Sequence, residues 1–475
     1  MSFLFQDRFS KKGGKKLSTQ NYSHTILTAS VFFWMIFFLN CAFTSPTDEK
    51  QHLVNELNHS LKTEVLDVWY PATIDTIEGG FITNFSFDWK ALDFQTKMIV
   101  TQARHVWTTA AVTKFYHDDK YRQIAAHGFR FLKDKMWDAE YGGFFTFQQK
   151  TSGRFQNDGK TAYGNAFALY ALAAYYSVSS DIAALSLAKQ TFYWLEKHSH
   201  DPEHKGYINI LNRDGSWESA RYSDRTPGLL SGAGLKDHNS SIHLMEAFTE
   251  LYRVWPDSLL RVRTIELLQL IRDQIITPKG YMTLFFERDW TPISFRDSAE
   301  AVRKMNQHFD NVSFGHDVET GYLMLETSHV LGLEISSKTL PVAKKMVDHA
   351  LANGWDAVNG GFYYEGYYFD DSDSITIMNK SKQWWVQAEA LNAFLLMSKL
   401  FPNEKKYADA FEKQWEYIKK YLIDHEYGGW YVEGLDINPQ ARKSLKAHSW
   451  KGNYHNVRAL VNCIHILKGE FELIR

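Results

Sequence analysis

The stretch SFGHDVET, residues 313 to 320, carries a histidine and two carboxylates inside a region otherwise suited to packing. His316 and Glu319 stand three residues apart, so a helix would place them on one face. Two further histidines, His243 and His455, begin other apolar segments far away in the sequence. A neutral imidazole can remove a proton near neutral pH and return one, so these residues indicate acid–base chemistry.

The composition limits the classes of protein to which the chain can belong. Its 475 residues are 44% hydrophobic and 23% charged, with a net charge of −2, which predicts a globular protein and no nucleic-acid partner. Aromatic residues reach 15%, and aromatic faces in clefts commonly stack against sugar rings. The two cysteines, Cys41 and Cys463, cannot form a disulfide framework, and no paired Cys/His spacing indicates structural zinc.

The first 45 residues have the composition of a targeting segment. Basic residues at positions 8, 11, 12, 15 and 16 precede the apolar run from Ile26 to Phe43. This pattern predicts a signal peptide or an N-terminal membrane anchor in residues 1–45, and an exported or membrane-tethered protein of the cell envelope. Lipidation at Cys41 is a weaker alternative, because the bulky residues 38 to 40 make a poor lipobox. We expect the folded domain to comprise residues 46–475.

One phrase recurs along this domain and defines a repeat. It reads DTIEGGF at 75, DAEYGGF at 138, DAVNGGF at 356 and DHEYGGW at 424, and the degenerate copies DPEHKGY at 201 and ITPKGYM at 276 complete six. The glycines permit a tight turn. We place the aromatic marker of each repeat at Phe81, Phe144, Tyr207, Tyr281, Phe362 and Trp430.

Each marker separates two kinds of segment. Amphipathic segments such as 181–198 and 404–422 precede it and predict outer helices, whereas segments such as 163–176 and 384–400 are apolar nearly all round and predict buried inner helices. A lone outer-type helix at about 50–69 and a lone inner-type helix at about 453–467 can pair and close a ring. We therefore predict an all-α fold, an (α/α)6 toroid of twelve helices in inner and outer layers, in preference to a linear α-solenoid.

Polar residues gather early in the inner segments, where parallel helices would bring them to one mouth of the barrel. The set comprises Arg104, Tyr163, Asn239, His243, His316, Glu319, Trp384, Trp385, Gln387, Glu389, Trp450 and His455. Each has a structural alternative, such as hydrogen bonding along one helix or core packing of the tryptophans. A metal site at His316 and Glu319 lacks obvious further ligands, and we expect the cluster HSHDPEH, residues 198–204, to be a solvated loop.

At these residues the sequence resembles the N-acylglucosamine 2-epimerase superfamily, and within it the cellobiose 2-epimerases, over nearly all of residues 50 to 470. The motifs are QARHVW, TAYGNAFALYALAAYY, DHNSSIHLMEA, SFGHDVE, KQWWVQAEA and WKGNYHNVRA. The family has an (α/α)6 barrel, in agreement with the repeat count. The resemblance implies inversion of C2 in the reducing-end sugar of β-1,4-linked disaccharides, converting cellobiose to glucosyl-mannose, without metal or other cofactor. We expect the protein to be a monomer or homodimer.

The resemblance also implies roles for individual residues. His316 and His455 would exchange protons with the two faces of C2 after ring opening, through an enediolate, and Glu319 would orient His316. His243 would assist ring opening or hold O1. The sugar would be bound by Arg104, Tyr163, Asn239, Trp385, Glu389 and Trp450.

Other activities remain open from the sequence. Within the superfamily these are an N-acylglucosamine 2-epimerase or a mannose isomerase, and an envelope location suits mannobiose as well as cellobiose as substrate. A glycosidase or lyase would use Glu319 and Glu389 as its paired carboxylates, and a glycan-binding protein would need only aromatics and a groove. Both of these last alternatives leave the three histidines unexplained.

Overall fold

The computed structural model describes residues 46–151, 154–156, 159–217, 236–369, 372–471 and 473. The chain divides into two compact units, Met1–Leu53 and Val54–Arg475, and all predicted site residues belong to the second. The apolar run at 26 to 43, predicted as a signal or anchor, lies outside the described residues. Within the described part of the chain, no helix has both the length and the apolar character needed to span a membrane.

Helices of 13 or more residues alternate between two layers, and the described residues contain twelve of them. The inner layer consists of α4 (Ile99–Tyr116), α6 (Ala162–Ser179), α8 (His238–Val254), α11 (Phe314–Val330), α13 (Trp384–Leu400) and α15 (Tyr454–Lys468). The outer layer consists of α2 (Pro46–His59) from Val54 onward, α5 (Asp119–Phe131), α7 (Ile182–His198), α9 (Ser258–Leu270), α12 (Thr339–Asn353) and α14 (Lys405–Tyr421). Two shorter helices are α3 (Asp67–Ala72) and α10 (Glu300–Asn306).

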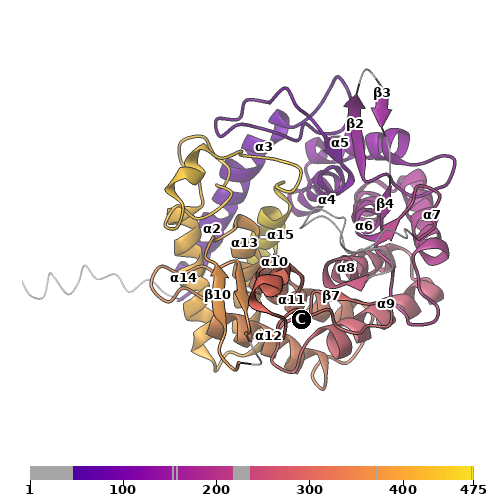
Figure 1. Cartoon of the computed structure of the whole chain (residues 1–475). Helices are drawn as coiled ribbons and strands as arrows, with labels where there is room; N and C mark the ends of the chain where they lie inside the picture. Colours follow the sequence, from indigo (N-terminus) through magenta and orange to yellow (C-terminus); the bar gives the residue numbers. More distant parts are fainter. Residues whose placement is uncertain are drawn as a thin grey trace, which may run out of the picture. The chain divides into compact units, whose positions relative to one another are not determined.

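The inner helices of the unit Val54–Arg475 form a closed ring (Figure 1). Each one contacts the next in chain order, and α15 returns to contact α4. The last inner helix, α15, also contacts the π-helical segment η1 (Ser60–Leu66) that continues the first outer helix. The predicted (α/α)6 toroid and its closure by the first and last helices are therefore confirmed, and the linear solenoid is wrong.

The helix faces explain the two layers. In α6, thirteen residues between Ala162 and Tyr175 are buried, and its small alanines allow the close approach of both neighbouring inner helices. In α14 the buried residues recur at helical spacing, from Tyr407 through Phe411 and Trp415 to Ile418, so one stripe packs inward. Helices that are apolar on all sides are stable only inside the molecule. Amphipathic helices pack their apolar face against them and expose their polar face.

Short antiparallel strands hold the start of four inner helices. β1 (Lys97–Met98), β4 (Lys160–Thr161), β6 (Lys236–Asp237) and β8 (Val312–Ser313) each end directly before an inner helix. They pair with β2 (Phe147–Thr151), β5 (Ile210–Leu211), β7 (Phe285–Phe286) and β9 (Glu365–Tyr367), while β3 (Arg154–Gln156) and β10 (Thr376–Asn379) extend two of these sheets. Because the backbone is fixed there, the first residues of these helices have defined positions.

The glycine turns are tied to the inner helices by side-chain amides. Gln102 Oε1 accepts the N–H of Phe81 at 2.7 Å, and its Nε2 donates to the carbonyl of the same residue at 2.9 Å. Asn165 does the same for Phe144, and Gln387 for Phe362. These amides replace the hydrogen bonds that the buried turn backbone would otherwise lack. Gln387, one of the polar residues predicted to face the cavity, thus has a structural role.

The fourth repeat differs from this pattern by one residue. Its turn is closed by a bridge between Ile276 and Met282, one residue shorter than the bridge between Trp137 and Phe144. The N–H of Met282 donates to Asp317 Oδ1 at 3.0 Å, in the place of the amides above. The marker predicted at Tyr281 is therefore wrong, because the shortened turn moves it to Met282. Asp317 is structural, and burial raises the pKa of its carboxyl well above the ordinary value.

A buried ion pair between lysine and aspartate recurs in five of the six repeats. The pairs are Lys97–Asp75, Lys160–Asp138, Lys236–Asp201, Lys382–Asp356 and Lys446–Asp424. In the fourth repeat, Thr277 has the position that the aspartate has in the other repeats, directly after the residue that forms the turn's bridge. Val312, two residues before α11, has the position that Lys97 has before α4. Both members of the pair are replaced together, which avoids leaving one buried charge without a counter-ion.

Candidate active site

The indole of Trp385 links the two histidines predicted to act as acid and base. Its ring centroid lies 4.8 Å from that of His316 and 5.6 Å from that of His455. The three residues come from α11, α13 and α15, which are consecutive members of the inner ring. The structure therefore brings His316 and His455 into one compartment.

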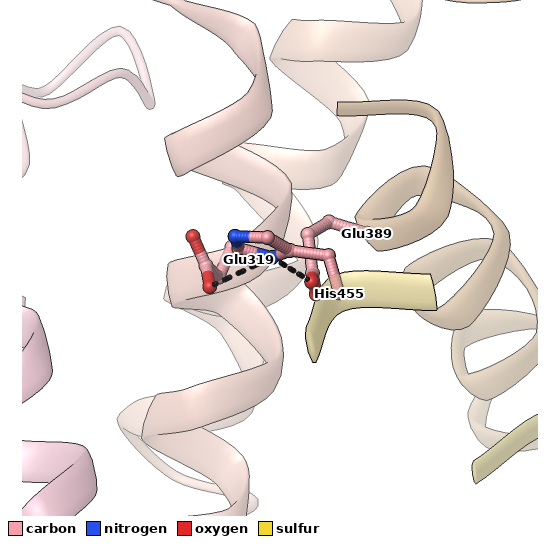
Figure 2. Close-up of side chains that lie close together, drawn as sticks. All are labelled: Glu319, Glu389 and His455. Atoms are coloured by element: carbon pink, nitrogen blue, oxygen red, sulfur yellow. Dashed lines mark hydrogen bonds and ion pairs between the residues drawn. The ribbon is translucent and has the colours of Figure 1, made fainter. Parts of the chain in front are cut away.

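His455 is oriented by a carboxylate from the neighbouring helix. Its Nδ1 lies 2.7 Å from Glu389 Oε1 and 4.0 Å from Glu319 Oε1. The dashed lines in Figure 2 mark these two contacts. Since an ionised carboxylate only accepts, Nδ1 carries the hydrogen and Nε2 is left to exchange protons. Burial lowers the pKa of His455 well below its ordinary value, helped by the charges of Arg104 and Arg458. The imidazole is thus neutral at pH 7.

Arg458 connects three buried carboxylates. It bonds Glu246 Oε1 and Glu319 Oε1, and its Nη2 lies 2.7 Å from Glu389 Oε1. Burial opposes its charge, but the nearby carboxylates outweigh this effect, and the pKa of Arg458 is raised well above its ordinary value. We did not select Arg458 from the sequence. Its position three residues after His455 in YHNVR, on the same helix face, was the available signal.

The role predicted for Glu319 is wrong in one respect. We expected its carboxylate to orient His316 on the same helix, but it accepts a hydrogen bond from Arg458 instead. The Nδ1 of His316 lies 2.9 Å from Ser313 Oγ and 3.3 Å from His238 Nε2. Burial lowers the pKa of His316 well below its ordinary value, and a charge on His238, His243 or His455 acts in the same direction.

His243 forms its own pair with a carboxylate on α8. Its Nδ1 lies 2.8 Å from Glu246 Oε2, and its ring packs on Phe167 and Tyr163 with centroid separations of 4.7 and 5.4 Å. Burial opposes ionisation of Glu246, but the Arg458 charge and the bond to His243 outweigh it and lower the pKa to about 2. Glu246 was also missed in the sequence, although it follows His243 by three residues.

The remaining predicted site residues line the same region. Arg104 donates to the hydroxyl of Tyr163 at 3.3 Å, and its guanidinium lies over the ring of Phe167 at 4.4 Å. Trp450 is 38% exposed with its ring centroid 6.3 Å from that of Tyr163, so it stands at the open edge of the site. Asn239, the second residue of α8, follows His238.

Several polar atoms of this cluster are buried without a hydrogen-bond partner among the described residues. They are Arg104 Nε, Asn239 Oδ1, Glu319 Oε2, Glu389 Oε2 and Arg458 Nε. Buried polar groups in folded proteins are almost always paired, so such a concentration indicates a site built for a polar ligand. Both donors and acceptors are represented, which suits a ligand rich in hydroxyl groups.

Comparison with known proteins now gives the family. The sequence model of N-acylglucosamine 2-epimerase (GlcNAc 2-epimerase) matches residues 80–459. The chain belongs to the N-acylglucosamine 2-epimerase family. The resemblance inferred from the motifs is therefore confirmed, and the chain is a carbohydrate epimerase of the isomerase class.

Relatives in this family cover most of the chain. A cellobiose 2-epimerase of Bacteroides fragilis is 28% identical over 87% of this chain and 98% of its own length. A D-mannose isomerase of Marinomonas mediterranea is 24% identical over 84% of this chain and 93% of its own. The solved structure of cellobiose 2-epimerase from Bacillus thermoamylovorans B4167 covers 87% of this chain and 99% of its own, at 27% identity and a TM-score of 0.75.

One group of side chains in this epimerase has the composition of a metal site. Ligand atoms of Glu319, Glu389 and His455 all lie within 4.8 Å of one another (Figure 2). The guanidinium of Arg458, however, bonds both carboxylates, and Glu389 also receives the imidazole. The donor set is thus already engaged with a cation supplied by the chain, which accounts for the geometry without a metal ion.

The segment HSHDPEH, residues 198–204, and the side chain of Trp384 were also singled out in the sequence. In the stretch HSHDPEH, His200 Nε2 lies 2.9 Å from Glu266 Oε1, and Asp201 pairs with Lys236 and Arg288, so this segment is bonded into the fold rather than merely solvated. Trp384 is only 4% exposed and belongs to the core. The structural alternative for Trp384 is confirmed, whereas Trp385 lies between the site histidines.

Proposed function

We propose that the protein inverts C2 of the reducing-end sugar of a β-1,4-linked disaccharide, such as cellobiose or mannobiose, by proton transfer through an enediolate. The observation that carries this proposal is the pair of imidazoles, His316 and His455, that share the ring of Trp385. Inversion requires proton removal from one face of a carbon and delivery to the other. Two bases on different helices meet this requirement, whereas a single base favours return of the proton to the same face.

The proton balance follows from the surroundings of the two rings. In the open-chain sugar the C1 aldehyde makes the C2 proton acidic, and the neutral His316 accepts it. His455, which is neutral in the resting site, takes up a proton from solvent once the enediolate has formed and delivers this proton to the opposite face of C2, and His316 then releases its proton to solvent. The carboxylates of Glu389 and Glu319 beside His455 stabilise its imidazolium. The reverse reaction exchanges the two roles. Each cycle thus leaves the sugar with the same number of protons.

The other groups bind and open the sugar. The pair His243 and Glu246 is placed to move a proton at O1 or O5 when the pyranose ring opens. Arg104 and Asn239 offer an unpaired donor and an unpaired acceptor to sugar oxygens, and a cation near the developing enediolate stabilises its negative charge. Trp450, at the open edge, is placed to stack on the second sugar ring.

A glycosidase is less well supported by these contacts. Glu319 and Glu389 both bond the same guanidinium nitrogen of Arg458. Glycoside hydrolysis requires one carboxyl group to act as a protonated acid, and burial does raise the pKa of Glu389. The Oε1 atom of Glu389, however, is shared between Arg458 and His455 rather than directed alone at a leaving group. The two carboxylates are better suited to supporting His455.

The proposal is tested by hydrogen exchange at C2. The full chain is incubated in deuterated water with cellobiose, mannobiose, glucose, mannose or N-acetylglucosamine, and the products are examined by NMR. We expect deuterium at C2 of both epimers of a disaccharide, and the loss of about 100-fold or more of this rate in His316→Asn and His455→Asn. A ketose product from mannose would instead assign a mannose isomerase. Absence of exchange with every sugar would overturn the proposal.

We further propose that residues 26 to 43 export the protein or tether it to the cell envelope. The basic and apolar pattern of the sequence is the sole support. Fractionation of cells expressing the chain, with and without residues 1–45, checks this. Equal recovery of both forms in the cytoplasm would contradict it.

A further inference from the structure

We propose that His238 is a positioning residue that holds His316 in the tautomer whose Nε2 is free to accept a proton. The inference rests on the role of His316 in the proposed function. His238 does not need to touch the sugar, since it acts through the ring of His316.

The fold fixes one nitrogen of His238 as a hydrogen-bond donor. Asp237 pairs with Phe285 between β6 and β7, and His238 follows as the first residue of α8. Both its backbone N–H and its ring Nδ1 lie 3.0 Å from the carbonyl oxygen of Leu284. A carbonyl oxygen only accepts hydrogen bonds, so the hydrogen of the neutral imidazole is on Nδ1. Its Nε2 then carries a lone pair.

This lone pair determines the tautomer of His316. His238 Nε2 lies 3.3 Å from His316 Nδ1, and the two rings are nearly perpendicular, at 79°. If Nδ1 of His316 were unprotonated, two lone pairs would face each other at hydrogen-bonding distance. The arrangement without this repulsion has the hydrogen on His316 Nδ1, donated to His238, with Ser313 Oγ at 2.9 Å as a second acceptor. The Nε2 of His316 is then the bare nitrogen.

Two features of the surroundings keep His238 in the required neutral form. Its ring is buried, and burial lowers its pKa, although the charge of Asp237 and the bond to Leu284 oppose this. A charge on His243 acts in the same direction as burial. A neutral His238 can accept from His316 both before and after proton transfer, so the hydrogen bond is kept when His316 becomes an imidazolium. No carboxylate is then needed at His316, in contrast to His243 and His455.

Two substitutions at this position form a matched pair. In His238→Asn the amide reaches the position of Nδ1 and can bond Leu284, but offers nothing to His316. In His238→Gln the amide oxygen reaches the position of Nε2 and can accept from His316. We expect kcat to fall about 10- to 100-fold in His238→Asn with KM changed less than about twofold, and His238→Gln to recover most of this loss. Equal losses in both variants would contradict positioning.

A second measurement does not depend on turnover. Nitrogen-15 NMR of the full chain, with the His316 signals assigned by their loss in His316→Asn, reports which ring nitrogen is protonated. We expect a protonated Nδ1 and a bare Nε2 near neutral pH, and an increased share of the other tautomer in His238→Asn. A protonated Nε2 in the unsubstituted protein would overturn the inference, whether or not a sugar is epimerised. Failure of C2 exchange with this tautomer present would instead count against the proposed function alone.

Discussion

The Nδ1 atom of His455 lies 2.7 Å from Oε1 of Glu389, across the contact between α15 and α13. This carboxylate fixes the tautomer of the imidazole and stabilises its protonated form. We therefore expect Glu389→Gln to lower kcat for epimerisation about 100-fold while KM changes little, since a wrong tautomer impairs proton transfer rather than binding. Glu326→Gln, a partly exposed position on α11, is the control, and an unchanged kcat in Glu389→Gln would argue against this role.

The close approach of α11 to Trp385 predicts the effect of a single methyl group. A Cβ at Gly315 would lie 2.6 Å from both Cη2 of Trp385 and Cγ2 of Val386, whereas the nearest atom to a Cβ at Gly321 on the same helix is 3.4 Å away. We expect Gly315→Ala to displace the indole between the two histidines and lower kcat about 10-fold, and Gly321→Ala to leave it nearly unchanged. Steady-state kinetics of both variants check this. Equal kcat values would show that the indole position is not critical.

The burial of His316 and His455 determines how far the pH can fall before activity is lost. Burial lowers the pKa of His316 and His455 well below the ordinary value of 6.5. The neutral form persists above the lowered pKa and is lost only as the pH falls through it. We therefore expect kcat/KM to reach half of its maximum on the acid side at a pH below 6.5. Half-maximal kcat/KM above this pH would mean that the imidazoles are not desolvated in the free enzyme.

The recurring ion pairs predict coupled effects on stability. Lys97 Nζ lies 2.6 Å from Asp75 Oδ2, and both side chains are largely buried. We expect Lys97→Val or Asp75→Thr alone to lower the free energy of unfolding by about 3–5 kcal/mol, because each leaves a buried charge without its partner. The double variant has the residue types of the fourth repeat and should lose less than the sum. Urea denaturation measures all three, and strictly additive losses would contradict this coupling.

Hydrophobic periodicity and the glycine turns were sufficient to predict the layers, because one-sided and all-round apolar helices have only one stable arrangement each. The closure of the ring by the first and last helices was predictable for the same reason. The marker of the fourth repeat was not, since a turn shortened by one residue places Met282 where the sequence pattern suggested Tyr281. Only the backbone hydrogen bond to Asp317 reveals this register.

The shared direction of the inner helices was sufficient to predict that the histidines converge. It was not sufficient to predict which side chains contact them. Glu319 and His316 are neighbours on α11, which made a contact between them the natural expectation. The structure pairs Glu319 with Arg458, which lies 139 positions away in the sequence, on α15. His238, likewise, meets His316 across two helices. Such contacts depend on the rotation of each helix about its axis, which a spacing rule does not specify.

The place of α15 in the ring has a consequence for biosynthesis. Glu246, Glu319 and Glu389 are translated before Arg458, so the nascent chain carries three carboxylates whose common counter-ion has not yet been made. Only when α15 emerges from the ribosome and docks between η1, α4 and α13 can these charges be drawn together. A chain arrested before residue 454 would lack both His455 and Arg458 and would leave the ring open, so the last inner helix to be synthesised is the one that completes the site.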